Sequence, residues 1–92
     1  MPDVTVTLPG LLAPFVDDGR TVRVEADTLG DAVDRLVDSH PALEPHLFDG
    51  DGGLRTHLRL YRNGAGVEWT DADDVGLAEG DEVLVLQAVS GG

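Results

Sequence analysis

One segment of this chain has the apolar periodicity of a helix, and this restricts how the other segments can fold. Between residues 29 and 37, apolar side chains recur every three or four positions and form one stripe: Leu29, Ala32, Val33, Leu36 and Val37. Thr28 is a suitable N-cap, Asp31 stands three residues later as in a capping box, and Pro41 ends the helix near His40. A single helix can cover only one face of a sheet, so the remaining segments must fold within that limit.

The segments before this helix alternate between apolar and polar side chains, which is the period of a half-buried strand. Residues 4–8 and residues 21–25 both follow this pattern. Pro9-Gly10 interrupts the first run, and Asp17-Asp18-Gly19 has the composition of a turn before the second. We therefore predict that the chain begins with two strands that form a hairpin with a long loop.

The segments after the helix contain a connection and a second predicted hairpin. Residues 42–54 are predicted to connect the helix to the sheet, with a few side chains that pack, and residues 57–61 alternate as a third strand. Asn63-Gly64 is a strong signal for a hairpin turn, and Gly66 suggests a bulge. Residues 67–69 are predicted to form a short fourth strand.

The last predicted strand, residues 82–88, is apolar at nearly every position, which is typical of a central strand covered on both faces. Val83 and Val85 share one face of this strand, and Leu84 and Leu86 share the other. If the helix covers the valine face, the two leucines form an apolar patch beside the C-terminal tail. We therefore predict Leu84 and Leu86 as a partner-binding surface.

The predicted order is strand, strand, helix, strand, strand, strand, in a chain of 92 residues, which is one domain by length. The economical packing of these elements is a mixed five-stranded sheet on one main helix. This is the β-grasp, or ubiquitin-like, plan of the α+β class. Residues 1–88 are predicted to form this domain, and residues 89–92 are predicted to form a flexible C-terminal tail that ends in two glycines.

The tail, Val89-Ser90-Gly91-Gly92, is the segment whose chemistry is most informative. Residues without a Cβ let the backbone pass through a narrow active site, so this tail can thread into that of a partner. A terminal carboxylate is a poor electrophile until it is activated, for instance as a mixed anhydride with AMP, and Gly92 adds no crowding at the reacting carbon. We predict Gly92 and Gly91 as the reactive end, with Val89 and Ser90 threaded into the partner's active site.

The composition argues against several other classes of function. Eighteen acidic residues, six arginines and no lysine give a net charge of -12, which argues against nucleic acid and membrane surfaces as partners and favours a basic protein surface. The chain has no cysteine, and hence no disulfide, thiolate metal site or thiol nucleophile. It shows no signal peptide and no apolar run long enough to span a membrane, so we expect a cytoplasmic protein.

The residue types that bind metals form no recognisable motif, and we predict no metal site. Asp49-Gly50-Asp51 begins like a calcium loop, but Leu60 stands where the glutamate at the twelfth position is required. His40, His46 and His57 lack the spacing of a zinc site.

Four stretches, in this order along the chain, resemble the MoaD/ThiS family of ubiquitin-like sulfur carriers. They are Thr28-Leu29-Gly30-Asp31, residues 58–63, Gly80-Asp81-Glu82-Val83 and the Ala-Val-Ser-Gly-Gly end at residues 88–92. The family includes the small subunit of molybdopterin synthase, the thiamine sulfur carrier and the carrier of cysteine biosynthesis. Small archaeal ubiquitin-like modifiers share this tail.

The resemblance implies a carrier protein that acts as a co-substrate and is not itself an enzyme, or that serves as a small subunit of a sulfurtransferase complex. A ubiquitin-activating-like adenylyltransferase would spend ATP to adenylate Gly92, and a persulfide sulfurtransferase would supply the sulfur of a thiocarboxylate. A downstream synthase would then receive this sulfur. The carrier itself would bind no cofactor, because the activating partner uses the ATP.

Two other functions remain open at this point. The chain could be a ubiquitin-like modifier whose Gly92 is joined to lysines of target proteins, or a β-grasp interaction module without tail chemistry. For a sulfur carrier, the receiving pathway is open as well: molybdopterin, thiazole, cysteine or tRNA thiolation.

The net charge predicts that the protein becomes more stable as salt is added. The excess of acid fits a salty cytoplasm or the bias of a high-GC genome, and in both cases added ions screen the repulsion between carboxylates. The melting temperature in molar salt should therefore exceed the melting temperature at low salt. Equal values would contradict this prediction.

Overall fold

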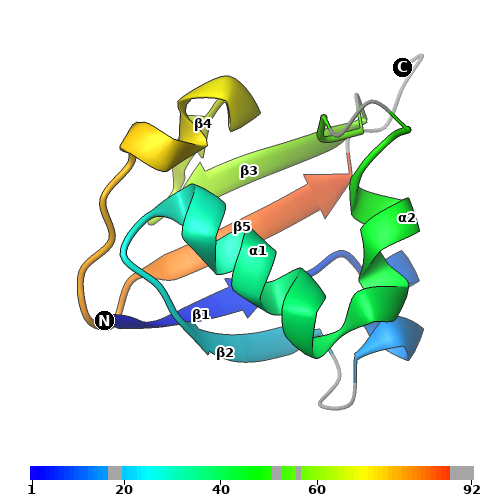
Figure 1. The fold of residues 1–92 in the computed structure, drawn as a ribbon, viewed down its shortest axis with the longest axis horizontal. Helices are drawn as coiled ribbons and strands as arrows, with labels where there is room; N and C mark the ends of the chain where they lie inside the picture. The colour runs from blue at the N-terminus through cyan, green and yellow to red at the C-terminus, as the bar shows by residue number, and fades with distance from the viewer. Residues whose placement is uncertain (17–19, 51–52, 56, 88–92) are drawn as a thin grey trace.

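A computed structural model of the chain contains a five-stranded mixed sheet with one long helix across one of its faces (Figure 1). It describes residues 1–16, 20–50, 53–55 and 57–87. The strand order in the sheet is β2-β1-β5-β3-β4. These strands are β1 (Asp3–Thr7), β2 (Thr21–Glu25), β3 (Leu58–Arg62), β4 (Ala65–Val67) and β5 (Glu82–Gln87). Because β5 pairs parallel with β1 and antiparallel with β3, it is the central strand, and the predicted β-grasp arrangement is confirmed.

The helix α1 (Leu29–Ser39) begins and ends where the sequence predicts. The hydroxyl of Thr28 accepts a hydrogen bond from Asp31 N at 3.1 Å, as an N-cap side chain does. The Asp31 carboxylate accepts from Asp27 N at 3.4 Å, one residue before the cap, so the capping box is only half formed. Within the described part of the chain, no helix is long and apolar enough to cross a membrane.

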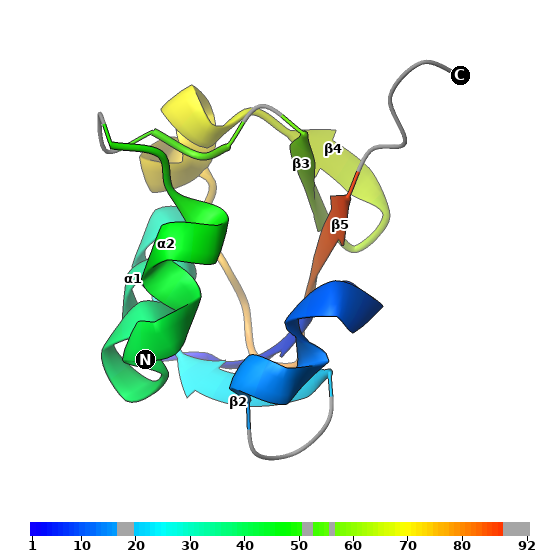
Figure 2. The ribbon, with the colours of Figure 1, turned by 90° about the vertical axis from the view of Figure 1, so that its right-hand side faces the viewer.

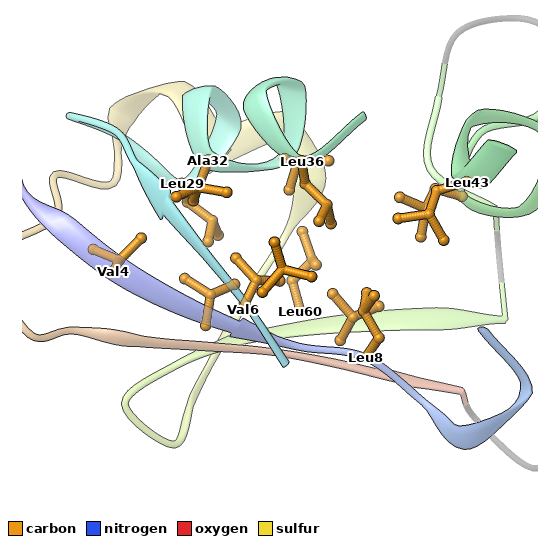
Figure 3. Close-up of a cluster of buried hydrophobic side chains, with 14 of the residues drawn as sticks. Val4, Val6, Leu8, Leu29, Ala32, Leu36, Leu43 and Leu60 are labelled. Atoms are coloured by element: carbon orange, nitrogen blue, oxygen red, sulfur yellow. The ribbon is translucent and has the colours of Figure 1, made fainter. Parts of the chain in front are cut away.

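The core lies between α1 and the face of the sheet that is turned toward this helix (Figure 2). Val4, Val6 and Leu8, from β1 and the residue after it, meet Leu29 and Leu36 of α1 (Figure 3). Each of these five side chains is 1% exposed or less. Full burial of one such side chain stabilises a fold by about 1.5–3 kcal/mol, so the contact between α1 and the sheet is a major source of stability.

Two short helical turns close one end of the core between α1 and β3. They are η2 (Pro41–Leu43) and α2 (Glu44–Leu47). Leu43 and Leu47 are buried and Phe48 packs against the core, so the predicted connecting segment with packing side chains is confirmed. The turns themselves are not predicted from the sequence, because three or four residues do not show a full helical period.

The β3–β4 hairpin differs from its prediction. Asn63-Gly64 has positive φ at both residues, 48° and 87°, and forms a two-residue turn after which pairing resumes at Ala65. The predicted fourth strand is present as β4, but it lies two residues earlier than the predicted range of 67–69, and the 3₁₀ helix η3 (Trp69–Asp74) begins at the end of that range. The bulge predicted at Gly66 is wrong, because the register of β3 and β4 is continuous through this residue.

The helices α1 and η3 approach each other closely at Gly30. A Cβ at this position would overlap the carboxylate of Asp73, so a larger residue would displace the Asp73 side chain from its present position. Just after η3, Val75 O accepts a hydrogen bond from Leu29 N at 2.9 Å, which satisfies an amide at the first turn of α1. These contacts anchor the chain between β4 and β5 to the helix.

Leu36→Ala tests how much of the stability comes from the contact between α1 and the sheet. Leu36 is fully buried, so the variant should lose about 2–5 kcal/mol of unfolding free energy through the lost burial and the cavity left behind. Chemical denaturation measures this loss. Leu11→Ala is the matched control, because Leu11 is 69% exposed, and it should change the unfolding free energy by no more than about 0.5 kcal/mol. Similar losses in both variants would contradict the prediction.

Candidate functional site

The strand β5 ends in the middle of the sheet, and the surfaces around its carboxyl end form the candidate site. Residues 82–84 pair with β1 and residues 83–87 pair with β3, so the strand is held on both sides. The predicted tail residues Val89, Ser90, Gly91 and Gly92 lie outside the described residues. The described part of the site therefore consists of the end of β5 and the side chains near it.

The two faces of β5 differ in burial as the parity of its sequence predicts. Val83 and Val85 are buried against the core. Leu84 is half-buried on the opposite face, and Leu86 on that face is 41% exposed. The prediction that this strand is covered on both faces is wrong, because α1 covers only the valine face. The leucines are thus placed where a partner can reach them.

The neighbouring strands extend the surface around these two leucines. Leu84 lies between Thr7 of β1 and Tyr61 of β3, and Leu86 lies opposite Arg59 of β3. Tyr61 is half-buried and Arg59 is exposed. We call Leu84, Leu86, Tyr61 and Arg59 the open-face patch.

Tyr61 and Arg59 belong to this surface, although the sequence alone does not predict it. Their alternation with Leu58 and Leu60 places both side chains on one face of the third strand. Only the strand order shows that this is also the face of Leu84, because β3 is a direct neighbour of β5. The alternation in the sequence therefore shows that Tyr61 and Arg59 share a face of β3. The strand order is also needed to show that Leu84 and Leu86 lie on that face.

The start of β5 is fixed by hydrogen bonds to Asp81, which is buried. Its carboxylate accepts from Arg62 Nε at 3.0 Å, Asn63 Nδ2 at 3.0 Å and Ala78 N at 2.9 Å. The side-chain oxygen of Asn63 accepts from Glu82 N at 2.9 Å. The Asn63 amide, and after it the Ala78 amide and the Arg62 guanidinium, hold the pKa of Asp81 below its ordinary value, although burial acts in the opposite direction. The β3–β4 turn and the first residue of β5 are thereby joined.

Acidic residues are concentrated on the solvent side of α1, away from the open-face patch. Burial, followed by the charges of Asp73, Asp31 and Asp38, raises the pKa of Asp34 above its ordinary value. Asp73 belongs to η3, and the other three residues belong to α1. Strong negative potential therefore lies on the helix side of the molecule, while Arg59 lies on the sheet side.

Two of the residues considered as metal ligands in the sequence, His46 and Asp49, have other contacts in the structure. Among the described residues, no three histidine or carboxylate side chains are grouped in a way that could hold a metal ion. The ring of Phe15 stacks on His46, with 4.1 Å between the ring centroids. Gly53 N donates a hydrogen bond to Asp49 Oδ1 at 3.3 Å, so Asp49 stabilises its own turn.

A comparison with known protein families matches residues 6–92 to the ThiS family. The chain belongs to the ThiS family. This match covers the whole sheet from the middle of β1 onward, and it confirms the resemblance found in the sequence.

Two relatives of this ThiS-family chain illustrate the functions found in similar proteins. It is 45% identical over 80 residues to Small archaeal modifier protein 1 of Haloferax volcanii, a match that covers 84% of this chain and 87% of that protein. It is 30% identical over 92 residues to the sulfur carrier protein CysO of Mycobacterium tuberculosis, covering 98% of this chain and 99% of CysO. The relatives are thus small carrier and modifier proteins.

Solved structures of these two proteins share the fold of the ThiS-family chain. The crystal structure of the Haloferax volcanii protein has a TM-score of 0.82 at 38% identity, and the match covers 97% of this chain and 100% of that one. The crystal structure of Mycobacterium tuberculosis CysO has a TM-score of 0.81 at 30% identity, covering 94% and 99% of the two chains.

Asp81→Asn tests whether the hydrogen bonds at the start of β5 stabilise the fold. The folded-state pKa of Asp81 lies below its value in the unfolded chain, so the stabilisation is fully present above that unfolded value and is lost as pH falls through the folded value. The variant should therefore melt at a lower temperature than the wild type at pH ~7, and the difference should shrink toward pH ~3.

The exposed Asp74 offers a control for this experiment, because Asp74→Asn removes the same charge from η3. Thermal melts of the three proteins across this pH range give the comparison. A difference between wild type and Asp81→Asn that stays constant with pH would contradict the assigned role of the ionised carboxylate.

Proposed function

We propose that this ThiS-family protein is a sulfur carrier whose working group is the carboxylate of Gly92. A ubiquitin-activating-like enzyme would adenylate this carboxylate, and the thiocarboxylate made from it would donate sulfur in the biosynthesis of a cofactor or an amino acid. The observation that carries the proposal is the position of β5. This strand is central: residues 82–84 pair with β1, and the pairing with β3 continues to its last residue, Gln87, so residues 88–92 follow a point that the pairing with β3 fixes.

The open-face patch supports the proposal because it lies beside that fixed point. Leu86 directly precedes Gln87 and is 41% exposed. Each Å² of apolar surface that a partner removes from water contributes about 25 cal/mol, so covering the patch favours binding. An enzyme that binds there is also close to the start of the tail.

The proposed conversion of the Gly92 carboxylate to a thiocarboxylate takes three steps. The Gly92 carboxylate attacks the α-phosphorus of ATP, which forms an acyl adenylate and releases pyrophosphate. The terminal sulfur of a protein persulfide then attacks the acyl carbon and expels AMP. A thiol finally reduces the resulting acyl disulfide, which leaves the thiocarboxylate on Gly92 and a new disulfide between the donor sulfur and that thiol.

The role of this chain in these steps is to present an unhindered carboxyl group. Gly91 and Gly92 have no Cβ, so the tail can pass through a channel that larger residues would block. The similarity to CysO, named a sulfur carrier protein, extends over nearly the whole chain and supports the proposal.

A second candidate function is protein modification, and the 45% identity to Small archaeal modifier protein 1 favours it. In this case the amine of a lysine on a target protein attacks the acyl adenylate, expels AMP and forms an isopeptide bond with Gly92. The chain has no lysine, so it cannot receive such linkages on lysine side chains of its own. Both candidates depend on the same activation of Gly92.

Mass spectrometry of the protein purified from its native host distinguishes the two candidates. A sulfur carrier should show a fraction that is heavier by about 16 Da, because sulfur replaces one carboxylate oxygen. A modifier should instead yield conjugates in which target lysines carry a glycine remnant of the tail. Native protein with neither signal would contradict both functions.

Two variants, Gly92→Ala and a chain without Gly92, change only the predicted reactive end. Gly92→Ala should lose adenylation and keep the melting temperature of the wild type, since Gly92 is predicted to lie outside the core. If removal of Gly92 leaves sulfur transfer and conjugates unaffected, the protein is an interaction module without tail chemistry.

A further inference from the structure

A groove of about 550 Å³ lies at the carboxyl end of β5, separate from the open-face patch. One wall is the 3₁₀ helix η1 (Gly10–Phe15), which Figure 2 shows in blue next to β5. The opposite wall includes Pro45 and His46 of α2. Leu58 and Gln87, which are paired across β3 and β5, also line it. The groove therefore adjoins the last described residue of the central strand.

The walls of this groove are held in place by contacts within the fold. The rings of Phe15 and His46 stack with an interplanar angle of 29°, which joins η1 to α2. Arg55 Nε donates to Pro45 O at 2.8 Å, and Arg55 N donates to Leu47 O at 2.9 Å. A groove that is formed before binding costs little ordering entropy when a partner enters it.

Apolar exposure is concentrated around the end of β5. Among the described residues, three large hydrophobic side chains are exposed: Met1, Leu11 and Leu86. Leu11 is 69% exposed and lines the groove, and Leu86 belongs to the open-face patch. Exposed apolar groups therefore lie on both sides of the point where the chain leaves the sheet, which is typical of an interaction surface.

The charge of the groove differs from that of the molecule. Its described lining residues include Arg55, His46 and His57, and none of them carries a carboxylate. By contrast, a second groove beside α1 is lined by Asp34 and Asp38 among other acidic residues. In a chain with a net charge of -12, an apolar groove whose described lining includes an arginine and no carboxylate favours an occupant with an apolar side chain and a carboxylate.

The length of the tail indicates which partner can place an apolar side chain and a carboxylate in this groove. Five residues from Ala88 to Gly92 follow Gln87 and span at most about 18 Å when extended, at 3.3–3.6 Å per residue. An enzyme that encloses Gly92 in its active site must therefore lie against the surfaces around the end of β5. These surfaces include the groove as well as the open-face patch.

We propose that the groove between η1 and α2 is a second docking site for the activating enzyme, which inserts an apolar side chain there and pairs a carboxylate with the basic groups at Arg55 and His57. This inference rests on the proposed function. The enzyme then contacts both surfaces beside the end of β5, the open-face patch and the groove, while the tail enters the active site of the enzyme.

Adenylation kinetics with the activating enzyme of the native host test this docking site. The rate of pyrophosphate release is measured as a function of carrier concentration for the wild type and for Leu11→Asp, His57→Glu and Leu86→Asp. Leu11→Asp and His57→Glu should each raise KM tenfold or more and leave kcat unchanged, because they remove docking contacts and do not touch the reacting carboxyl group. Thr70→Asp, at an exposed position of η3, adds the same charge as Leu11→Asp and should leave KM unchanged.

The outcomes separate this inference from the function on which it rests. If Leu86→Asp raises KM while Leu11→Asp and His57→Glu behave like Thr70→Asp, the groove is not a docking site and the proposed function stands. If the enzyme does not adenylate the wild type, both proposals are overturned. Leu11 and His57 are exposed, so their variants should fold, and melting temperatures equal to that of the wild type exclude misfolding as the cause.

Discussion

The packing of one long helix against a five-stranded sheet is the contact on which the rest of this structure depends. Leu29 and Leu36 of α1 meet Val4 and Val6 of β1, and together these side chains exclude water from one face of the sheet. The chain has no second long helix among its described residues, so the opposite face keeps its exposed side chains. An accessible sheet surface is therefore a direct result of how the core is completed.

The side chains of the central strand alternate between the core and the open face of the sheet. Val83 and Val85 complete the core, while Leu84 and Leu86 belong to the open-face patch. The carboxyl end of β5 is held by its pairing with β3, which continues to Gln87, while β1 holds the first half of the strand. The apolar surfaces that flank this end, on the open face and in the groove beside η1, are thereby kept at a constant position relative to the start of the tail.

Much of this fold follows from local patterns, and the exceptions have identifiable physical causes. Periodicity predicts α1, the strands β1, β2 and β3, and the faces of β5, since burial on one side imposes a fixed spacing. It misplaces β4, because the left-handed conformation at Asn63-Gly64 shortens the turn and brings the paired residues forward. The groove is not predicted at all. Its walls are short turns whose positions depend on tertiary contacts such as the stacking of Phe15 on His46.

The parallel pairing of β1 with β5 places the first and the last elements of the described residues side by side. Contacts between residues so distant in sequence form late, since a long loop must close before they can contribute. During synthesis, the sheet thus remains open at its centre until β5 has left the ribosome. A chain truncated before β5 would therefore lack the strand that joins β1 to β3 in the sheet.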